Sequence, residues 1–130
     1  MDGSSVLLVL CRRILAGLLV ESIRKRTGME AYELVEFDRA KDMSMLYKPK
    51  LALVEVPERN GSPTLDALTV CKEIKEASPG CKVILICPEN DEDSVKASLN
   101  AIRGGEIDDF LFYDLSVDYL VAKIESLLPA

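Results

Sequence analysis

The sequence has no histidine and no tryptophan, and its four cysteines stand apart from one another. Cys11, Cys71, Cys81 and Cys87 form no C-x-x-C pair, so the ligand patterns of common zinc sites are missing. Isolated thiols of this kind are typical of reduced, intracellular proteins. We therefore expect no metal and no cofactor.

Long apolar runs are also missing. The stretch from Val6 to Val20 is interrupted by Cys11-Arg12-Arg13, so it cannot span a bilayer. It has no basic region before it and no small-residue cleavage site after it, which excludes a signal peptide. We expect a soluble, cytoplasmic protein without a membrane partner.

Positive charge is scarce. The net charge is -6 and the pI is about 4.7, which disfavours direct binding of nucleic acid, because phosphate contacts need clustered lysine and arginine. The two basic clusters, Arg12-Arg13 and Arg24-Lys25-Arg26, are interpreted as parts of a solvated helix face. With 130 residues, of which 48% are hydrophobic, the chain suits a single domain, 1–130, with a sizeable core.

The most informative stretch runs from Pro49 to Pro57. Within it, Leu51-Ala52-Leu53-Val54 is wholly apolar, which is typical of a strand buried on both faces of a parallel sheet. Glu55 closes this strand. Ligands of open α/β sheets bind just outside the carboxyl ends of the strands, so Glu55 is expected at the mouth of any active site.

Strand and helix patterns alternate along the chain. Residues 5–10, 32–37, 51–55, 82–87 and 109–113 have the patterns of strands, and a helical pattern follows each. Short connections and right-handed crossovers then require an open parallel sheet between two layers of helices. The predicted fold class is α/β: a flavodoxin-like (βα)5 three-layer sandwich with five parallel strands in the order 2-1-3-4-5. Segment 32–37 alternates and is expected at an edge.

The helices are predicted to bury apolar stripes at helical spacing. In 13–27 the stripe consists of Ile14, Leu15, Leu18, Leu19 and Ile23, and in the third helix, with Thr64 as its N-cap, it includes Leu65. The stripe of the fourth helix includes Leu99. Each of these apolar side chains is therefore expected to face the core.

Several segments, in this order and spacing, resemble the receiver domain of two-component response regulators. They are 49–55, which is similar to the family's strand that ends on the phosphoryl acceptor, 70–79, 83–87, and 108–111 with the helix capped at Ser116. The resemblance covers nearly the whole chain. It implies a flavodoxin-like fold and a role in signal transduction.

The chemistry of that family depends on residues that this sequence lacks. The family holds Mg²⁺ with acidic residues after the first strand and accepts phosphate on an aspartate after the third. It also uses a threonine or serine after the fourth strand and a lysine after the fifth. The corresponding residues here are Leu10-Cys11-Arg12, Glu55, Cys87 and Tyr113. We therefore predict a degenerate (pseudo-) receiver that is not an enzyme and lacks Mg²⁺-dependent aspartyl phosphorylation.

Two roles are open for Glu55. It could imitate the phosphorylated state by fixing a negative charge, or it could be a carboxylate that changed after the metal site was lost. Arg12 and Arg13 follow the first strand, so either side chain could lie beside Glu55 at the same edge of the sheet. A pair with Arg12 would neutralise the charge of Glu55 and weaken the mimicry.

Cys11 supports an alternative function, a phosphoryl-carrier or phosphatase-like enzyme. A cysteine between an apolar strand and a helix resembles the layout of phosphocysteine carriers and small tyrosine phosphatases, and a helix N-terminus can activate a thiol. A phosphate cradle needs a loop of small residues, however, whereas Arg12-Arg13-Ile14 follows here. We favour a buried, inert Cys11.

The resemblance also implies a partner surface, made by the fourth helix, fifth strand and fifth helix. Here it is expected to present Lys96, Asn100, Arg103, Tyr113 and Asp118. Receivers are often joined to a DNA-binding or other output domain. We expect such a domain in a longer chain, because the sequence stops soon after its last helix.

Two acidic clusters remain. Asp108-Asp109 is interpreted as a solvated turn, and 89–93 as an acidic loop that recruits a cation only weakly. Neither predicts a metal site.

Overall fold

A computed structural model describes residues 4–57, 61–88, 91–113 and 116–128. The elements are β1 (Ser5–Val9), α1 (Arg13–Thr27), β2 (Glu30–Leu34), the 3-10 helix η1 (Phe37–Arg39), α2 (Ala40–Tyr47), β3 (Leu51–Glu55), α3 (Pro63–Ala77), β4 (Lys82–Cys87), α4 (Glu92–Arg103), β5 (Asp109–Phe112) and α5 (Val117–Leu127). The strands form one parallel sheet in the order β2-β1-β3-β4-β5. The predicted flavodoxin-like sandwich and its strand order are confirmed.

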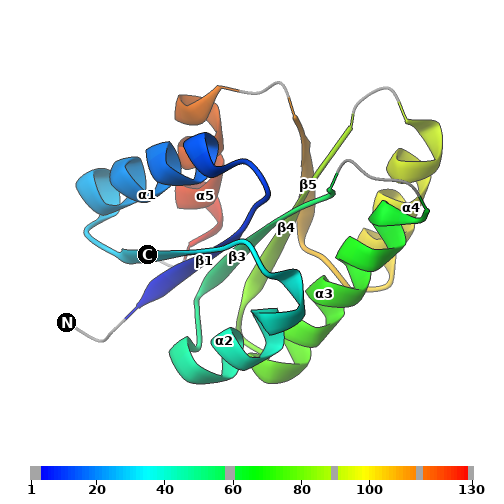
Figure 1. Ribbon diagram of the computed structural model, residues 1–130, viewed down its shortest axis with the longest axis horizontal. Helices are drawn as coiled ribbons and strands as arrows, with labels where there is room; N and C mark the ends of the chain where they lie inside the picture. Colours follow the sequence, from blue (N-terminus) through cyan, green and yellow to red (C-terminus); the bar gives the residue numbers. More distant parts are fainter. Residues whose placement is uncertain (1–3, 58–60, 89–90, 114–115, 129–130) are drawn as a thin grey trace.

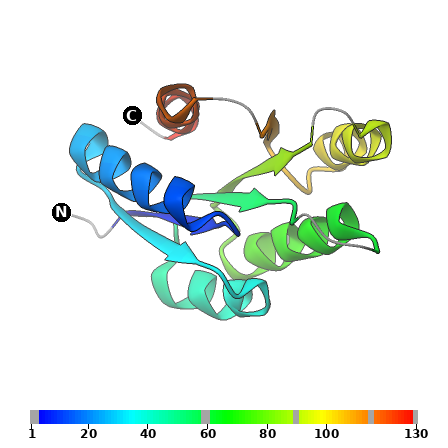
Figure 2. The same ribbon diagram turned by 45° about the horizontal axis from the view of Figure 1, so that its top comes forward.

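Helices cover both faces of the sheet. α1 and α5 lie over one face, and α2, α3 and α4 lie over the other (Figures 1 and 2). Alternate residues of β1 serve the two cores: Val6 and Leu8 pack with α1 and α5, while Leu7 and Val9 pack toward α2, α3 and α4. This is why the inner strands are apolar on both faces. No helix within the described ranges is long and apolar enough to cross a membrane.

Several side chains of the predicted apolar stripes do not face the sheet, although others, such as Leu19 and Ile23, are buried. Ile14 is 83% exposed, Leu18 48%, Leu65 59% and Leu99 42%, so the prediction that they are buried is wrong. Helix α1 buries part of its predicted stripe together with Ala16, whereas α4 buries a neighbouring face made of small side chains. The buried residues of these two helices are Ala16, Leu19, Ile23, Ser94, Ser98 and Ala101. Small side chains allow a helix to pack closely, which favours the buried face of α4.

Two predicted boundaries also need correction. The second strand covers Glu30–Leu34 and not 32–37, because the chain already turns into η1 at Phe37, with Glu36 at its N-cap position. Helix α3 is preceded by Ser62 as its N-cap, so Thr64 is not the cap. Thr64 lies inside the helix, where its hydroxyl is 2.5 Å from the hydroxyl of Ser94 on α4.

Asp108 and Asp109 are not a solvated turn. Asp108 Oδ2 accepts a hydrogen bond from Val83 N–H at 2.8 Å and lies 2.8 Å from Lys75 Nζ. Asp109 Oδ2 lies 2.6 Å from Lys123 Nζ. Partial burial opposes ionisation of Asp108, but the hydrogen bonds from Lys75 and Val83 outweigh it and lower its pKa below the usual value. The two ion pairs join the start of β5 to α3 and α5, and the hydrogen bond from Val83 joins it to β4.

Candidate functional site

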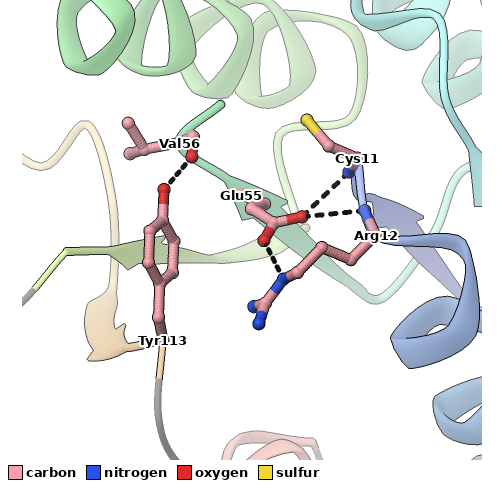
Figure 3. A network of polar contacts seen from close by, with 5 residues as sticks. All are labelled: Cys11, Arg12, Glu55, Val56 and Tyr113. Carbon is pink, nitrogen blue, oxygen red and sulfur yellow. Dashed lines mark hydrogen bonds and ion pairs between the residues drawn. The ribbon is translucent and has the colours of Figure 1, made fainter. Parts of the chain in front are cut away.

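The carboxyl ends of β1 and β3 bring Glu55 against the start of α1 (Figure 3). Glu55 is only 3% exposed. Its Oε1 accepts hydrogen bonds from the backbone N–H groups of Cys11 at 2.8 Å and Arg12 at 3.3 Å. Its Oε2 forms an ion pair with Nε of Arg12. Both carboxylate oxygens are therefore engaged by the connection between β1 and α1.

The sheet register explains this meeting. β1 and β3 are parallel neighbours, and Val9 lies opposite Val54. The chain leaves β1 just beyond Val9 and turns into α1, which places its N–H groups next to Glu55. α1 has no acidic residue in its first turn and no side-chain cap. Glu55 therefore supplies, from another strand, the negative charge that favours a helix N-terminus.

Tyr113, the residue that follows β5, lies at the same edge of the sheet as Glu55 and Arg12. Its hydroxyl donates a hydrogen bond to the carbonyl of Val56. The guanidinium carbon of Arg12 lies 5.1 Å from the centroid of the Tyr113 ring, within the range of a cation–π contact. Arg12 thus touches both Glu55 and Tyr113, and the ends of β1, β3 and β5 are joined. We call Arg12, Glu55, Val56 and Tyr113 the mouth network.

Two of the six predicted positions lie in the core and not at the mouth. Leu10 is 1% exposed and packs with the α1 and α5 core. Cys87 is fully buried at the end of β4, where the hydroxyl of Ser98 lies 3.8 Å from its sulfur. Burial raises the pKa of the Cys87 thiol. Sequence reasoning missed Val56, because it takes part through its backbone carbonyl, which leaves no signal in the sequence.

The residues present do not fit the magnesium ion that receiver chemistry uses. Mg²⁺ needs several oxygen ligands, but the Glu55 oxygens are taken by N–H donors and the neighbouring Arg12 is positive. Among the described residues, no three histidine, cysteine, aspartate or glutamate side chains form a group able to hold a metal. In the acidic segment 89–93, residues 89 and 90 lie outside the described part. The Asp91 carboxylate caps α4, and its pKa is lowered by the hydrogen bonds from Ser94.

Cys11 is exposed, so the expectation of a buried Cys11 is wrong. The chain turns outward after Leu10, and the backbone N–H of Cys11 points to Glu55 while its sulfur extends away (Figure 3). Exposure makes this thiol accessible to reagents. It also separates Cys11 from the other three cysteines, which are buried.

Under native conditions, we expect only Cys11 to react rapidly with a thiol reagent at about pH 8. Burial raises the pKa of Cys81 to about 12 and also raises the pKa values of Cys71 and Cys87, so these thiols stay protonated and shielded. The measurement is the time course of reaction with an aromatic disulfide. Cys11→Ser should abolish the fast phase, and a fast phase that survives this substitution would contradict the assignment.

The predicted partner surface is mostly solvent-facing. Lys96, Asn100 and Arg103 of α4 and Asp118 of α5 are exposed. Tyr113 is half-buried and belongs to the mouth network.

Comparison with solved structures finds response regulators. An orphan response regulator of H. pylori is 21% identical, with 97% of each chain covered and a TM-score of 0.78. A response regulator from Thermotoga maritima is 22% identical, with 95% of this chain and 96% of that chain covered and a TM-score of 0.74. The chain has the fold of a response-regulator receiver domain. The BeF3-activated N-terminal receiver domain of RstA from Klebsiella pneumoniae agrees, at 16% identity, a TM-score of 0.75, and 98% and 100% coverage of the two chains.

A scan of family models finds no match, and neither does a search of the curated proteins. The receiver resemblance is thus confirmed for the fold. Function has to be argued from the site.

Proposed function

We propose that this protein is a degenerate receiver, a signalling module that acts by binding other proteins and not by catalysis. The observation that carries the proposal is that both carboxylate oxygens of Glu55 are already bound within the protein. Both of its oxygens are bound to the N–H groups of Cys11 and Arg12 and to the Arg12 side chain. A metal or a phosphoryl group would have to displace all of these donors, which argues against Mg²⁺-dependent aspartyl phosphorylation.

The same contacts argue against a simple imitation of the phosphorylated state. A mimic must present its negative charge, but Glu55 is 3% exposed and paired with a cation. Arginine stays charged at all physiological pH values, so the pair neutralises Glu55 permanently. We infer that the mouth is held in one arrangement by the protein's own side chains.

In this proposal, the output of the module is contact with another protein. The surface of α4, β5 and α5 is the proposed site for a partner or a second copy, with Lys96, Asn100, Arg103 and Asp118 as its exposed polar residues and Tyr113 at its edge. In a longer chain, the module would act on a DNA-binding or other output domain.

This geometry does not support the alternative function, an enzyme that uses Cys11. A phosphate cradle beside Cys11 would need N–H groups directed at the phosphate. Those of Cys11 and Arg12 are directed at Glu55. We expect that a phosphodonor labels neither the unchanged protein nor Cys11→Ser. A label on the unchanged protein that disappears in Cys11→Ser would support the enzyme.

The deciding experiment is a thermal-shift titration with Mg²⁺ and beryllofluoride, beside a phosphorylation-competent receiver. A ligand at a hundredfold excess over its Kd stabilises a folded protein by about 2.7 kcal/mol, which raises Tm measurably. We expect the competent receiver to shift and this protein to remain unchanged. A shift here that disappears in Glu55→Gln would show a working acceptor site and overturn the proposal.

A further inference from the structure

A groove lies at the opposite end of β3 from the mouth network. It has a volume of about 260 Å³ and is lined by residues 48–50, which connect α2 to β3, and 77–80, which connect α3 to β4. Helices α2 and α3 pack side by side, and this brings the two connections together (Figures 1 and 2). We call the groove formed by 48–50 and 77–80 the lysine groove, because two of its residues are lysines.

The backbone around the lysine groove is held in place by the rest of the fold. The hydroxyl of Ser78 donates a hydrogen bond to the carbonyl of Pro49 at 3.4 Å, which joins the two connections directly. The backbone N–H of Lys50 donates to the carbonyl of Ser5 at 2.9 Å. Pro49 and Pro79 have fixed φ angles. The groove is therefore formed before any ligand arrives, which lowers the entropy cost of binding.

Lys48 has a backbone conformation that favours glycine. Its φ is 46°, and it is the one non-glycine residue with a positive φ in the described ranges. Helix α1 ends in the same way at Gly28, with φ of 74°. In each helix the N–H of this residue donates to the carbonyl four positions earlier. A side chain is strained in this conformation, so the presence of lysine at position 48 has to be explained by what its side chain does.

The charges of the two lysines are not compensated within the described chain. Lys48 and Lys50 are exposed, and neither forms an ion pair with any residue that the structure describes. Lys75, by contrast, pairs with Asp108 at 2.8 Å. No acidic side chain lines the groove among the described residues. A cation near a helix C-terminus is favourable, which gives Lys48 a role at the end of α2, but Lys50 belongs to no helix.

We propose that the lysine groove binds a small phosphate monoester with a flat, apolar organic part. A phosphate monoester carries about two negative charges at pH 7, which matches Lys48 and Lys50, and lysine commonly binds phosphate as a point charge. The organic part would pack against Ala77 and Pro79. Pockets for drug-sized ligands have volumes of about 300–1,000 Å³, so this slightly smaller groove suits a molecule with a single ring. The inference goes beyond the proposed function, because the groove shares no residue with the mouth network.

The test uses phenyl phosphate as the probe. It is titrated into the whole isotope-labelled protein, and the backbone amide shifts are followed by NMR. We expect saturable shifts of 48, 50, 77, 78 and 80. Phenol lacks the charge and inorganic phosphate lacks the ring, so each should bind at least about tenfold more weakly, because the charge and the buried ring both contribute.

Three variants assign the binding to the two lysines. Lys48→Gly and Lys50→Gln should each weaken phenyl phosphate binding about fivefold, the effect of losing one charge pair close to a protein surface. Lys41→Gln is the matched control, because it removes an exposed lysine near the other end of α2, and it should leave binding unchanged. Glycine relieves the backbone strain at position 48, so the Tm of Lys48→Gly should not fall. A loss of binding in that variant therefore does not come from unfolding.

Four results would overturn the inference. Phenol or inorganic phosphate could bind as tightly as phenyl phosphate, or the shifts could lie outside the groove. Binding that survives both Lys48→Gly and Lys50→Gln would limit Lys48 to its role at the end of α2. A phosphotyrosine peptide that binds more tightly than phenyl phosphate would assign the groove to a phosphorylated protein and not to a small molecule. The beryllofluoride titration, with its Glu55→Gln variant, reads the other end of β3, so either proposal can fail alone.

Discussion

Replacing Arg12 with methionine should lower the free energy of unfolding by about 3 kcal/mol. Removing one partner of a buried ion pair costs about 3–5 kcal/mol, because the other charge stays buried without compensation. The lower end applies here, since the Arg12 side chain is 44% exposed and two backbone N–H groups still bind Glu55. Urea denaturation measures the effect through a lower midpoint with an unchanged m-value.

Three companion variants identify the cause. Glu55→Gln should cost less, about 1 kcal/mol, because a neutral amide can still accept the Cys11 N–H and leaves no buried charge. The double variant should then lose less than the sum of the single losses, with a coupling of about 1–2 kcal/mol. Strictly additive losses would mean that the ion pair contributes nothing to stability. Arg12→Lys should fall between, since lysine keeps the charge but lacks the planar group that faces Tyr113.

Replacing Leu53 with alanine should cost about 3–4 kcal/mol, the other large effect. Leu53 lies in the middle of β3, is completely buried and packs in the core beneath α1 and α5. Truncation removes buried apolar surface and leaves a cavity that a rigid central strand cannot fill by moving. The loss should appear both in the urea midpoint and as a lower Tm.

Leu65→Ala is the matched control. Leu65 is 59% exposed on α3, so its truncation should change stability by less than about 0.5 kcal/mol. A loss as large as that of Leu53→Ala would mean that α3 is rotated and that the apolar stripe predicted from the sequence faces the core after all.

The contrast between these leucines shows what the sequence could predict. Strands such as Leu51–Glu55 are apolar on both faces, so a run of apolar letters identifies them and their inner position. Helix orientation is harder, because hydrophobic periodicity cannot show how closely a helix approaches the sheet. Helix α4 buries Ser98, whose hydroxyl is satisfied by the Ser94 carbonyl at 2.8 Å, and leaves Leu99 exposed.

The candidate site was predictable to a similar degree. Glu55 and Arg12 follow neighbouring parallel strands, and carboxyl ends of such strands meet, so their pairing could be anticipated. Tyr113 was expected at a lost lysine position and on the partner surface, but its contact with the end of β3 was not predicted. Its bond to the Val56 carbonyl crosses from β5 to β3 and has a backbone acceptor, so no pattern of residue types could indicate it.

The mouth network also determines how easily the protein could change between two conformations at this site. An ion pair, a cation–π contact and a phenol hydrogen bond hold the ends of three strands together without a removable group. The population of a second arrangement of the mouth would therefore fall exponentially as the free energy of breaking these contacts rises. A ligand can raise that population only by preferring the second arrangement, by about 1.4 kcal/mol for each tenfold change. Under the function that we propose, the response would then be graded by the concentration of a binding partner and not by the supply of a chemical donor.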